Sequence, residues 1–164
     1  MEQDGIDTAW RVQGATADWL ARADTKASFV LTLQSTALAV AGLLAGVNHA
    51  AIGAGSAGAK VFAGIGVLCM VIGVGFATAA IIPNLGKSGE EVGGSQDFTF
   101  FGHARNLDPV ALETAFRDDD PLPVLARQVV VLSGLAWVKH RRVQWSLLHA
   151  VAGCAAFGLA AVVG

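Results

Sequence analysis

The stretch Ala23-Asp24-Thr25-Lys26-Ala27-Ser28 opens an apolar run that continues from Phe29 to Val47. Asp24 and Lys26 place two opposite charges at the entrance of this run, and no further charged residue occurs before its end. About twenty apolar residues in an α-helix are enough to cross a bilayer. The run therefore predicts a first membrane span that begins directly after a charged entrance.

Small and weakly polar side chains fall on one narrow stripe when this region is turned at about 100° per residue. We call the part of the stripe in and next to the span the small-residue seam; its members are Asp24, Ser28, Thr32, Ser35, Ala39, Gly42 and Gly46. Bulkier side chains fall roughly opposite, namely Phe29, Val30, Leu33, Val40 and Leu44. Helices in lipid associate through small residues, so we expect the seam to join subunits of a homo-oligomer and the bulky side to face lipid. Two alternatives stay open: the stripe arises by chance in a chain rich in Ala and Gly, or it packs on the second span of the same chain.

The composition is that of an integral membrane protein. The 164-residue chain is 54% hydrophobic and only 15% charged, whereas about 25% of residues are charged in soluble domains. Its mean hydropathy is +0.55, and the apolar residues are concentrated in three blocks. The formal net charge of −2 gives no basic field that would attract nucleic acid.

The pattern predicts an all-α membrane protein with three transmembrane helices, long cytosolic helical extensions and a small helical cytosolic segment. One continuous helix is expected from about Asp7 to Gly46, and a second apolar block covers Val61 to Ile82. Asp108 followed by Pro109 is a good helix start and predicts a short helix through about Phe116. The predicted segments are 1–26 (cytosolic helix), 27–47 (first span), 48–60 (outer loop), 61–82 (second span), 83–145 (cytosolic segment) and 146–164 (third span).

The Lys and Arg residues predict the orientation. Ten of the eleven lie in segments 1–26 and 83–145, and Lys60 alone lies in the outer loop. Cytoplasmic loops of membrane proteins carry an excess of Lys and Arg. We therefore expect a multi-pass membrane protein with its N-terminus and the 83–145 segment in the cytoplasm.

Motifs of known enzyme classes are absent from the sequence. It has no Gly-rich phosphate loop ending in Gly-Lys-Ser/Thr, no His-rich metal helix and no nucleophile elbow. The acidic run Asp118-Asp119-Asp120 is interpreted as a solvated turn before Pro121 and not as a cation site, and His149 as an interfacial residue packed beside Trp145. We expect no catalysis and no metal or other cofactor.

Two features suggest ligand binding. Lys26, Lys139, Arg141 and Arg142 each flank a span and should lie at the cytosolic membrane surface, where Lys26, Lys139 and Arg142 could hold a phosphate. Phe101 and His103, in an aromatic cluster, offer rings for stacking against a base. The competing interpretations are a basic collar that contacts anionic lipid headgroups and aromatic packing between small cytosolic helices.

Several motifs together resemble the Pycsar effector transmembrane family. These are Ala23-Asp24-Thr25-Lys26-Ala27 before the first span, Pro83 after the second, Phe100-Phe101-Gly102-His103, and the Lys139 and Arg142 pair before the last apolar helix. The resemblance implies a role in bacterial anti-phage defence and a response to cUMP or cCMP made by a partner cyclase. It also implies that the activated protein damages the inner membrane and stops growth.

Other functional classes remain as alternatives. One is a constitutive oligomeric membrane scaffold or accessory subunit without a nucleotide ligand. Another is a small transporter or channel unit, which is disfavoured because the spans contain no carboxylate or Arg deep in the bilayer.

Overall fold

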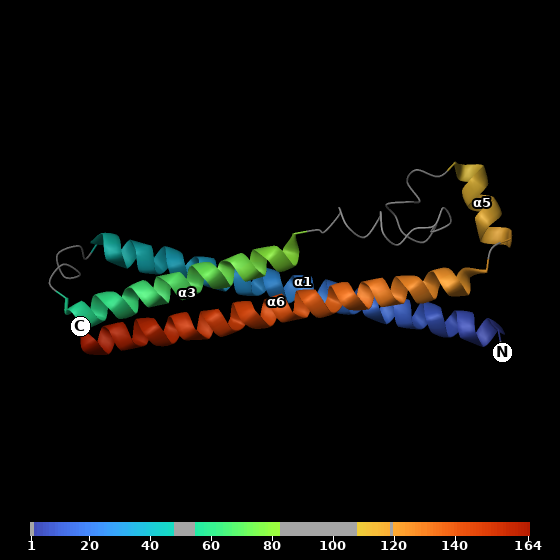
Figure 1. The fold of residues 1–164 in the computed structure, drawn as a ribbon. Coiled ribbons are helices and arrows are strands. Elements are labelled where there is room, and N and C mark those ends of the chain that lie inside the picture. Colours follow the sequence, from blue (N-terminus) through green and yellow to red (C-terminus); the bar gives the residue numbers. More distant parts are fainter. Residues whose placement is uncertain (1, 48–54, 83–107, 119) are drawn as a thin grey trace. The chain divides into compact units, whose positions relative to one another are not determined.

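A computed structural model of the chain describes residues 2–47, 55–82, 108–118 and 120–164. Four helices make up nearly all of this part of the chain: α1 (Glu2–Val47), α3 (Ala57–Ile81), α5 (Pro109–Asp118) and α6 (Pro121–Val163) (Figure 1). The expected aromatic cluster, with Phe101 and His103, lies outside the described residues.

Three of these helices, α1, α3 and α6, are long and apolar enough to cross a membrane. The first predicted span lies within α1, and the second and third extend only one residue beyond the ends of α3 and α6. The protein is therefore an all-helical membrane protein in the part of the chain that the structure describes.

Helix α1 continues without a break through the charged entrance, as predicted, and α6 likewise runs from the expected cytosolic part into the third span. Helix α1 begins at Glu2 and not near Asp7. Acidic side chains near a helix N-terminus interact favourably with the helix dipole, and Asp4 and Asp7 supply them in the first turns.

Helix α3 begins at Ala57, earlier than the predicted start at Val61, because Ser56 caps it. The Ser56 hydroxyl accepts a hydrogen bond from the Ala59 main-chain N–H at 3.1 Å and donates one to the Val163 carbonyl at 3.0 Å. A cap of this kind satisfies one of the free N–H groups of the first turn. Lys60 consequently lies inside the first turn of α3 and not in a loop.

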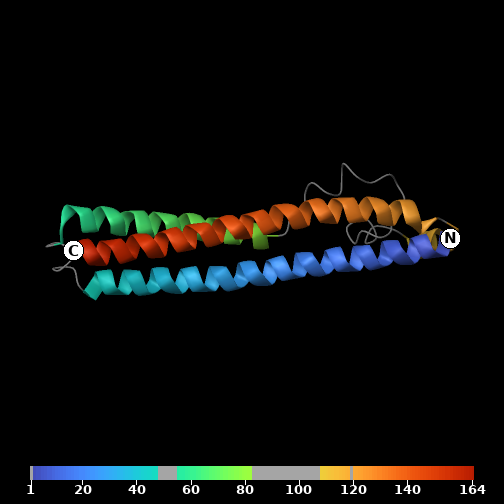
Figure 2. The same cartoon turned by 90° about the horizontal axis from the view of Figure 1, so that it is seen from below.

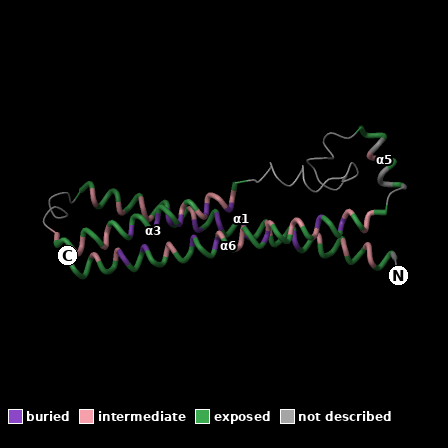
Figure 3. The backbone as a smooth tube through the Cα atoms, viewed as in Figure 1, coloured by how far each residue is buried: buried purple, intermediate pink, exposed green. Residues whose placement is uncertain are grey.

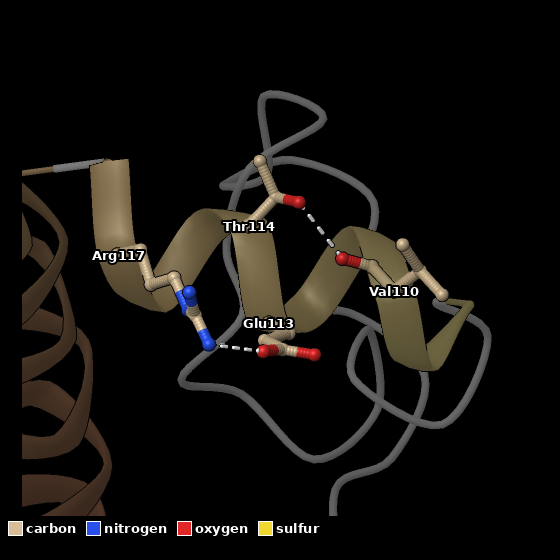
Figure 4. Close-up of polar contacts among 4 residues, drawn as sticks. All are labelled: Val110, Glu113, Thr114 and Arg117. Atoms are coloured by element: carbon tan, nitrogen blue, oxygen red, sulfur yellow. Dashed lines mark hydrogen bonds and ion pairs between the residues drawn. The ribbon is translucent and has the colours of Figure 1, made fainter.

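Two Asp-Pro pairs start α5 and α6. The Asp108 carboxylate accepts from the Val110 main-chain N–H at 3.1 Å, and Asp120 accepts from Leu122 in the same way at 3.0 Å. Within α5, Arg117 forms an ion pair with Glu113 at 2.5 Å one turn away (Figure 4). The prediction of a short helix after Asp108 is confirmed, and α6 starts at Pro121 because Asp120 caps it.

The chain forms two compact units. Residues 1–22 and 83–137 belong to the first, and residues 23–82 and 138–164 to the second. In the first unit, the Gln13 amide donates to Gln128 Oε1 at 2.7 Å, which joins α1 to α6, and Leu125 is fully buried.

In the second unit, which we call the membrane unit, Ala23–Val47, α3 and Val138–Val163 lie side by side (Figures 1 and 2). Helix α3 buries a regular stripe of mostly small residues, Gly66, Met70, Gly73, Ala77 and Ala80. Single buried positions recur along the helices, with intermediate and exposed positions between them (Figure 3). Exposed apolar side chains on all three helices are what a lipid-facing surface requires.

The face that α1 uses inside the membrane unit differs from the seam. Ala23, Ala27, Val30 and Gln34 are buried, with Val30 only 6% exposed. The expectation that Val30 faces lipid is therefore wrong, because α1 packs on its neighbours through the face at positions 23, 27, 30 and 34. The seam lies beside that face, and its members from Ser28 to Gly46 are exposed within the chain.

Candidate functional site

Lys139 joins α6 to α1 at the start of the membrane unit. Its Nζ donates a hydrogen bond to Asp24 Oδ1 at 2.5 Å, and the side chains are 19% and 40% exposed. Asp24, placed in the seam by the sequence pattern, thus has a partner within its own chain. The pair is only partly accessible to water, so it is screened less than a fully exposed ion pair.

Arg142, three residues further along α6, contacts α3. Its Nη1 donates to the Ala79 carbonyl at 2.5 Å, near the C-terminal end of that helix. The last carbonyls of a helix lack partners within it and carry partial negative charge. The guanidinium therefore satisfies one of these groups and links α6 to α3, as Lys139 links α6 to α1.

A buried polar node lies one turn deeper, at Ser146. The Gln34 amide donates to the Ser146 main-chain carbonyl at 2.9 Å, and the Ser146 hydroxyl donates to the Gly73 carbonyl at 2.8 Å. Gln34 is 2% exposed and Ser146 is 0% exposed. Since buried polar groups without partners are costly in an apolar medium, these bonds hold α1, α3 and α6 in one register.

Gly73 is required by this node. A Cβ atom on Gly73 would lie 2.6 Å from Gln34 Nε2, closer than non-bonded atoms approach. The absence of a side chain at this position gives the Gln34 amide its place between the helices.

A cluster of aromatic rings on α3 and α6 lies within one turn of Gly73 and Ser146 along these helices. The Phe76 and His149 ring centroids are 5.5 Å apart, and those of Phe76 and Trp145 are 6.4 Å apart. His149 Nδ1 is 2.8 Å from the Trp145 carbonyl oxygen. The expected packing of His149 beside Trp145 is confirmed.

The predicted ligand-binding residues are only partly brought together. Lys139 and Arg142 are one turn apart on α6 and bind neighbouring helices, whereas Lys26 is exposed on α1. Phe101 and His103 cannot be placed, because they lie outside the described residues. The two α6 cations form the part of the site that has defined geometry, and their chemistry suits an anion.

Sequence reasoning missed the node formed by Gln34, Gly73 and Ser146. A signal was present, because Gln34 is the one side-chain amide in the run from Phe29 to Val47, and such a side chain in lipid needs a partner. Which of the small or hydroxyl-bearing residues on the other helices would supply that partner depends on helix register. The order of residues in the sequence does not determine this register.

Comparison with a family model identifies the family of the chain. Searches of curated proteins and of solved structures returned no match. The family model PycTM, the Pycsar effector protein domain, matches residues 8–164, which is nearly the whole chain. The chain therefore belongs to the PycTM family and is a Pycsar anti-phage effector with three helices suited to cross a membrane.

Proposed function

We propose that this protein is activated by a cyclic pyrimidine mononucleotide, cUMP or cCMP, and then disrupts the bacterial inner membrane to abort infection. Membership of an effector family supports a response to a nucleotide from a partner cyclase. The three apolar helices support action at the membrane. No catalytic step is needed in this account.

The observation that carries the proposal is the pair of α6 cations. Lys139 and Arg142 lie on one side of α6, one turn apart, and their partners are an anion on α1 and a carbonyl on α3. A ligand phosphate held by these cations would act directly on the contacts between the three helices. Lys26 would add a third positive charge, and Phe101 with His103 would hold the base.

Activation follows from a difference in affinity between two states. A nucleotide that binds the active, assembled state more tightly than the resting state shifts the equilibrium by that difference and no more. The active state in this account is a homo-oligomer joined through the small-residue seam. The seam residues Ser28, Thr32, Ser35, Ala39, Gly42 and Gly46 are exposed within the single chain, so they are available to a second copy.

The orientation completes the proposal. With the N-terminus and the 83–145 segment in the cytoplasm, Lys139 and Arg142 would be on the side where a cyclase product accumulates. The excess of Lys and Arg in these segments supports this orientation.

One observation favours a second candidate function. Lys139 and Arg142 already have partners within the chain, as they would in a constitutive membrane scaffold that binds no nucleotide. In that case both cations serve only to hold the helices together.

Isothermal titration calorimetry separates the two functions. The purified full chain in lipid nanodiscs is titrated with cUMP, cCMP, cAMP and cGMP. The proposal expects saturable binding of a pyrimidine nucleotide and much weaker binding of the purine nucleotides. Absence of binding with all four would favour the scaffold.

A further inference from the structure

We propose that Asp24 is an internal competitor for the ligand. Its carboxylate holds the Lys139 ammonium in the resting protein, and the phosphate of the cyclic nucleotide takes its place on activation. This inference rests on the proposed function and assigns the regulatory step to one named pair.

The chemistry of the two anions makes the exchange direct. The phosphodiester of a cyclic mononucleotide carries one negative charge and two free oxygen acceptors, as a carboxylate does. The Asp24 oxygen lies 2.5 Å from Lys139 Nζ, so a phosphate at the same ammonium would meet a like charge at close range. Like charges at a few ångströms repel, and the phosphate therefore binds most tightly once Asp24 has moved away.

The two α6 cations differ in this respect. Arg142 is bound to an uncharged acceptor, the Ala79 carbonyl, so the partner that the structure describes for it carries no full negative charge. Lys139 is bound to a full negative charge. Of the two cations, Lys139 is thus the one whose availability to an anion is controlled by its partner.

The exchange has a structural consequence within the membrane unit. Within the membrane unit, the Asp24–Lys139 bond is a charged link between α1 and α6, and both residues lie within two residues of the point where each helix enters that unit. Its loss weakens the attachment of α1 to α6 at this end, while the bond from Gln34 to Ser146 deeper in the unit remains. A free ligand cannot replace the link, because it is not attached to α1.

The effect of neutralising Asp24 on nucleotide affinity distinguishes a competitor from a purely structural ion pair. If Asp24 only supports the fold, its neutralisation disturbs the position of Lys139 and weakens nucleotide binding or leaves it unchanged. If Asp24 competes with the ligand, its neutralisation strengthens binding.

The test is a double-mutant cycle on the full chain in phosphatidylcholine nanodiscs, with cUMP and cCMP as the titrants. Asp24→Asn should bind the active nucleotide about fivefold more tightly than the parent, the factor that corresponds to about 1 kcal/mol for a partly exposed pair. In the Lys139→Gln background the same change should give no gain, because the cation for which both anions compete is absent. Asp18→Asn, which removes an exposed carboxylate from the same helix, is the matched control and should leave the affinity unchanged.

The outcomes separate this inference from the function on which it rests. If the parent binds neither nucleotide, the proposed function fails and the competition fails with it. If the parent binds but Asp24→Asn binds equally or more weakly, the competition is wrong and the proposed function stands. Unchanged nucleotide affinity with tighter association of Asp24→Asn with phosphatidylglycerol vesicles would assign the exchange to lipid headgroups and also overturn the proposal. Asp24→Ser repeats the test with a smaller neutral side chain, and circular dichroism of every variant confirms that it is folded.

Discussion

The side-chain amide of Gln34 on α1 donates a hydrogen bond to the main-chain carbonyl of Ser146 on α6 at 2.9 Å, and both residues are buried. The hydroxyl of the same serine continues the chain of bonds to α3. The node formed by Gln34, Gly73 and Ser146 therefore connects all three helices of the membrane unit through buried hydrogen bonds.

Gly73→Ala should destabilise the protein, because the new methyl group meets the Gln34 amide and displaces it from Ser146. Gly75→Ala is the matched control, since a Cβ there meets nothing within 4 Å and the helix propensity gained is the same. Interhelical hydrogen bonds in membrane proteins contribute about 0.6 kcal/mol on average and up to about 1.7. Unfolding in detergent should therefore show Gly73→Ala less stable than Gly75→Ala by about 1 kcal/mol. Equal stabilities would show that the node does not hold the helices.

Gly153→Ala should loosen the contact between α3 and α6. Its Cβ would lie 3.1 Å from the Gly66 carbonyl oxygen, a main-chain atom that cannot rotate away, and 3.0 Å from Met70. Gly158→Ala on the same helix meets nothing within 4 Å and serves as the control. We expect a lower thermal midpoint of unfolding in detergent for Gly153→Ala but not for Gly158→Ala. An unchanged midpoint for Gly153→Ala would mean that the contact between α3 and α6 accommodates the added methyl group without loss of stability.

Much of the fold could be predicted from the sequence, because the signals are local. The Asp-Pro pairs before α5 and α6 and the uninterrupted apolar runs determine where helices form. The packing face of α1 could not be predicted in this way. Ala27 and Ser28 are neighbours and both small, yet Ala27 is fully buried and Ser28 is exposed. Which of the two adjacent faces of α1 is buried depends on how α3 and α6 pack against it.

The sequence also predicted only part of the candidate site, namely the two cations of α6 but not their partners. Charges that flank spans identified Lys139 and Arg142, but their partners could not be foreseen. One partner is Asp24, more than a hundred residues away in the chain, and the other is a main-chain carbonyl that has no sequence signature.

Lys139→Ala and Arg142→Ala should each weaken binding of the active nucleotide about tenfold or more, since a hydrogen bond to a charged group contributes about 1.5–3 kcal/mol. Both variants should also reduce the salt dependence of binding. Arg141→Ala removes an exposed charge from the same collar and should have little effect. Calorimetry at two salt concentrations makes the comparison; parental affinity in either α6 variant would assign that residue to helix packing or to the lipid collar.

The orientation is tested by thiol labelling in intact cells, in a background where Cys69 and Cys154 are replaced by Ala. A cysteine at Ala57, exposed at the start of α3, should react with a membrane-impermeant reagent. A cysteine at Val110, which is 69% exposed on α5, should be protected until the membrane is permeabilised. Labelling of both positions, or of neither, would contradict three spans with a cytoplasmic N-terminus.

Gly42→Leu should impair self-association and leave the fold of the single chain intact. A Cβ at Gly42 would meet nothing within 4 Å beyond its chain neighbours and the backbone of its own helix, so the larger side chain is accommodated within the protomer but blocks the close approach of a second helix. Leu33→Ala, a change at an exposed apolar position outside the seam, is the control. Disulfide cross-linking from a cysteine at Ala39 should give a dimer band that grows with nucleotide and is lost in Gly42→Leu. A dimer band unaffected by Gly42→Leu would place the subunit interface elsewhere.

Dye release from liposomes shows whether a cyclic pyrimidine nucleotide makes this protein permeabilise a membrane. The purified full chain is reconstituted in vesicles loaded with a self-quenched dye, and cUMP, cCMP, cAMP and cGMP are added separately on the side of Lys139 and Arg142. We expect a pyrimidine nucleotide to trigger release, the purine nucleotides at the same concentration to give none, and vesicles without protein to stay intact. Release that is equal with and without nucleotide, or no release with any of the four, would contradict the proposed function.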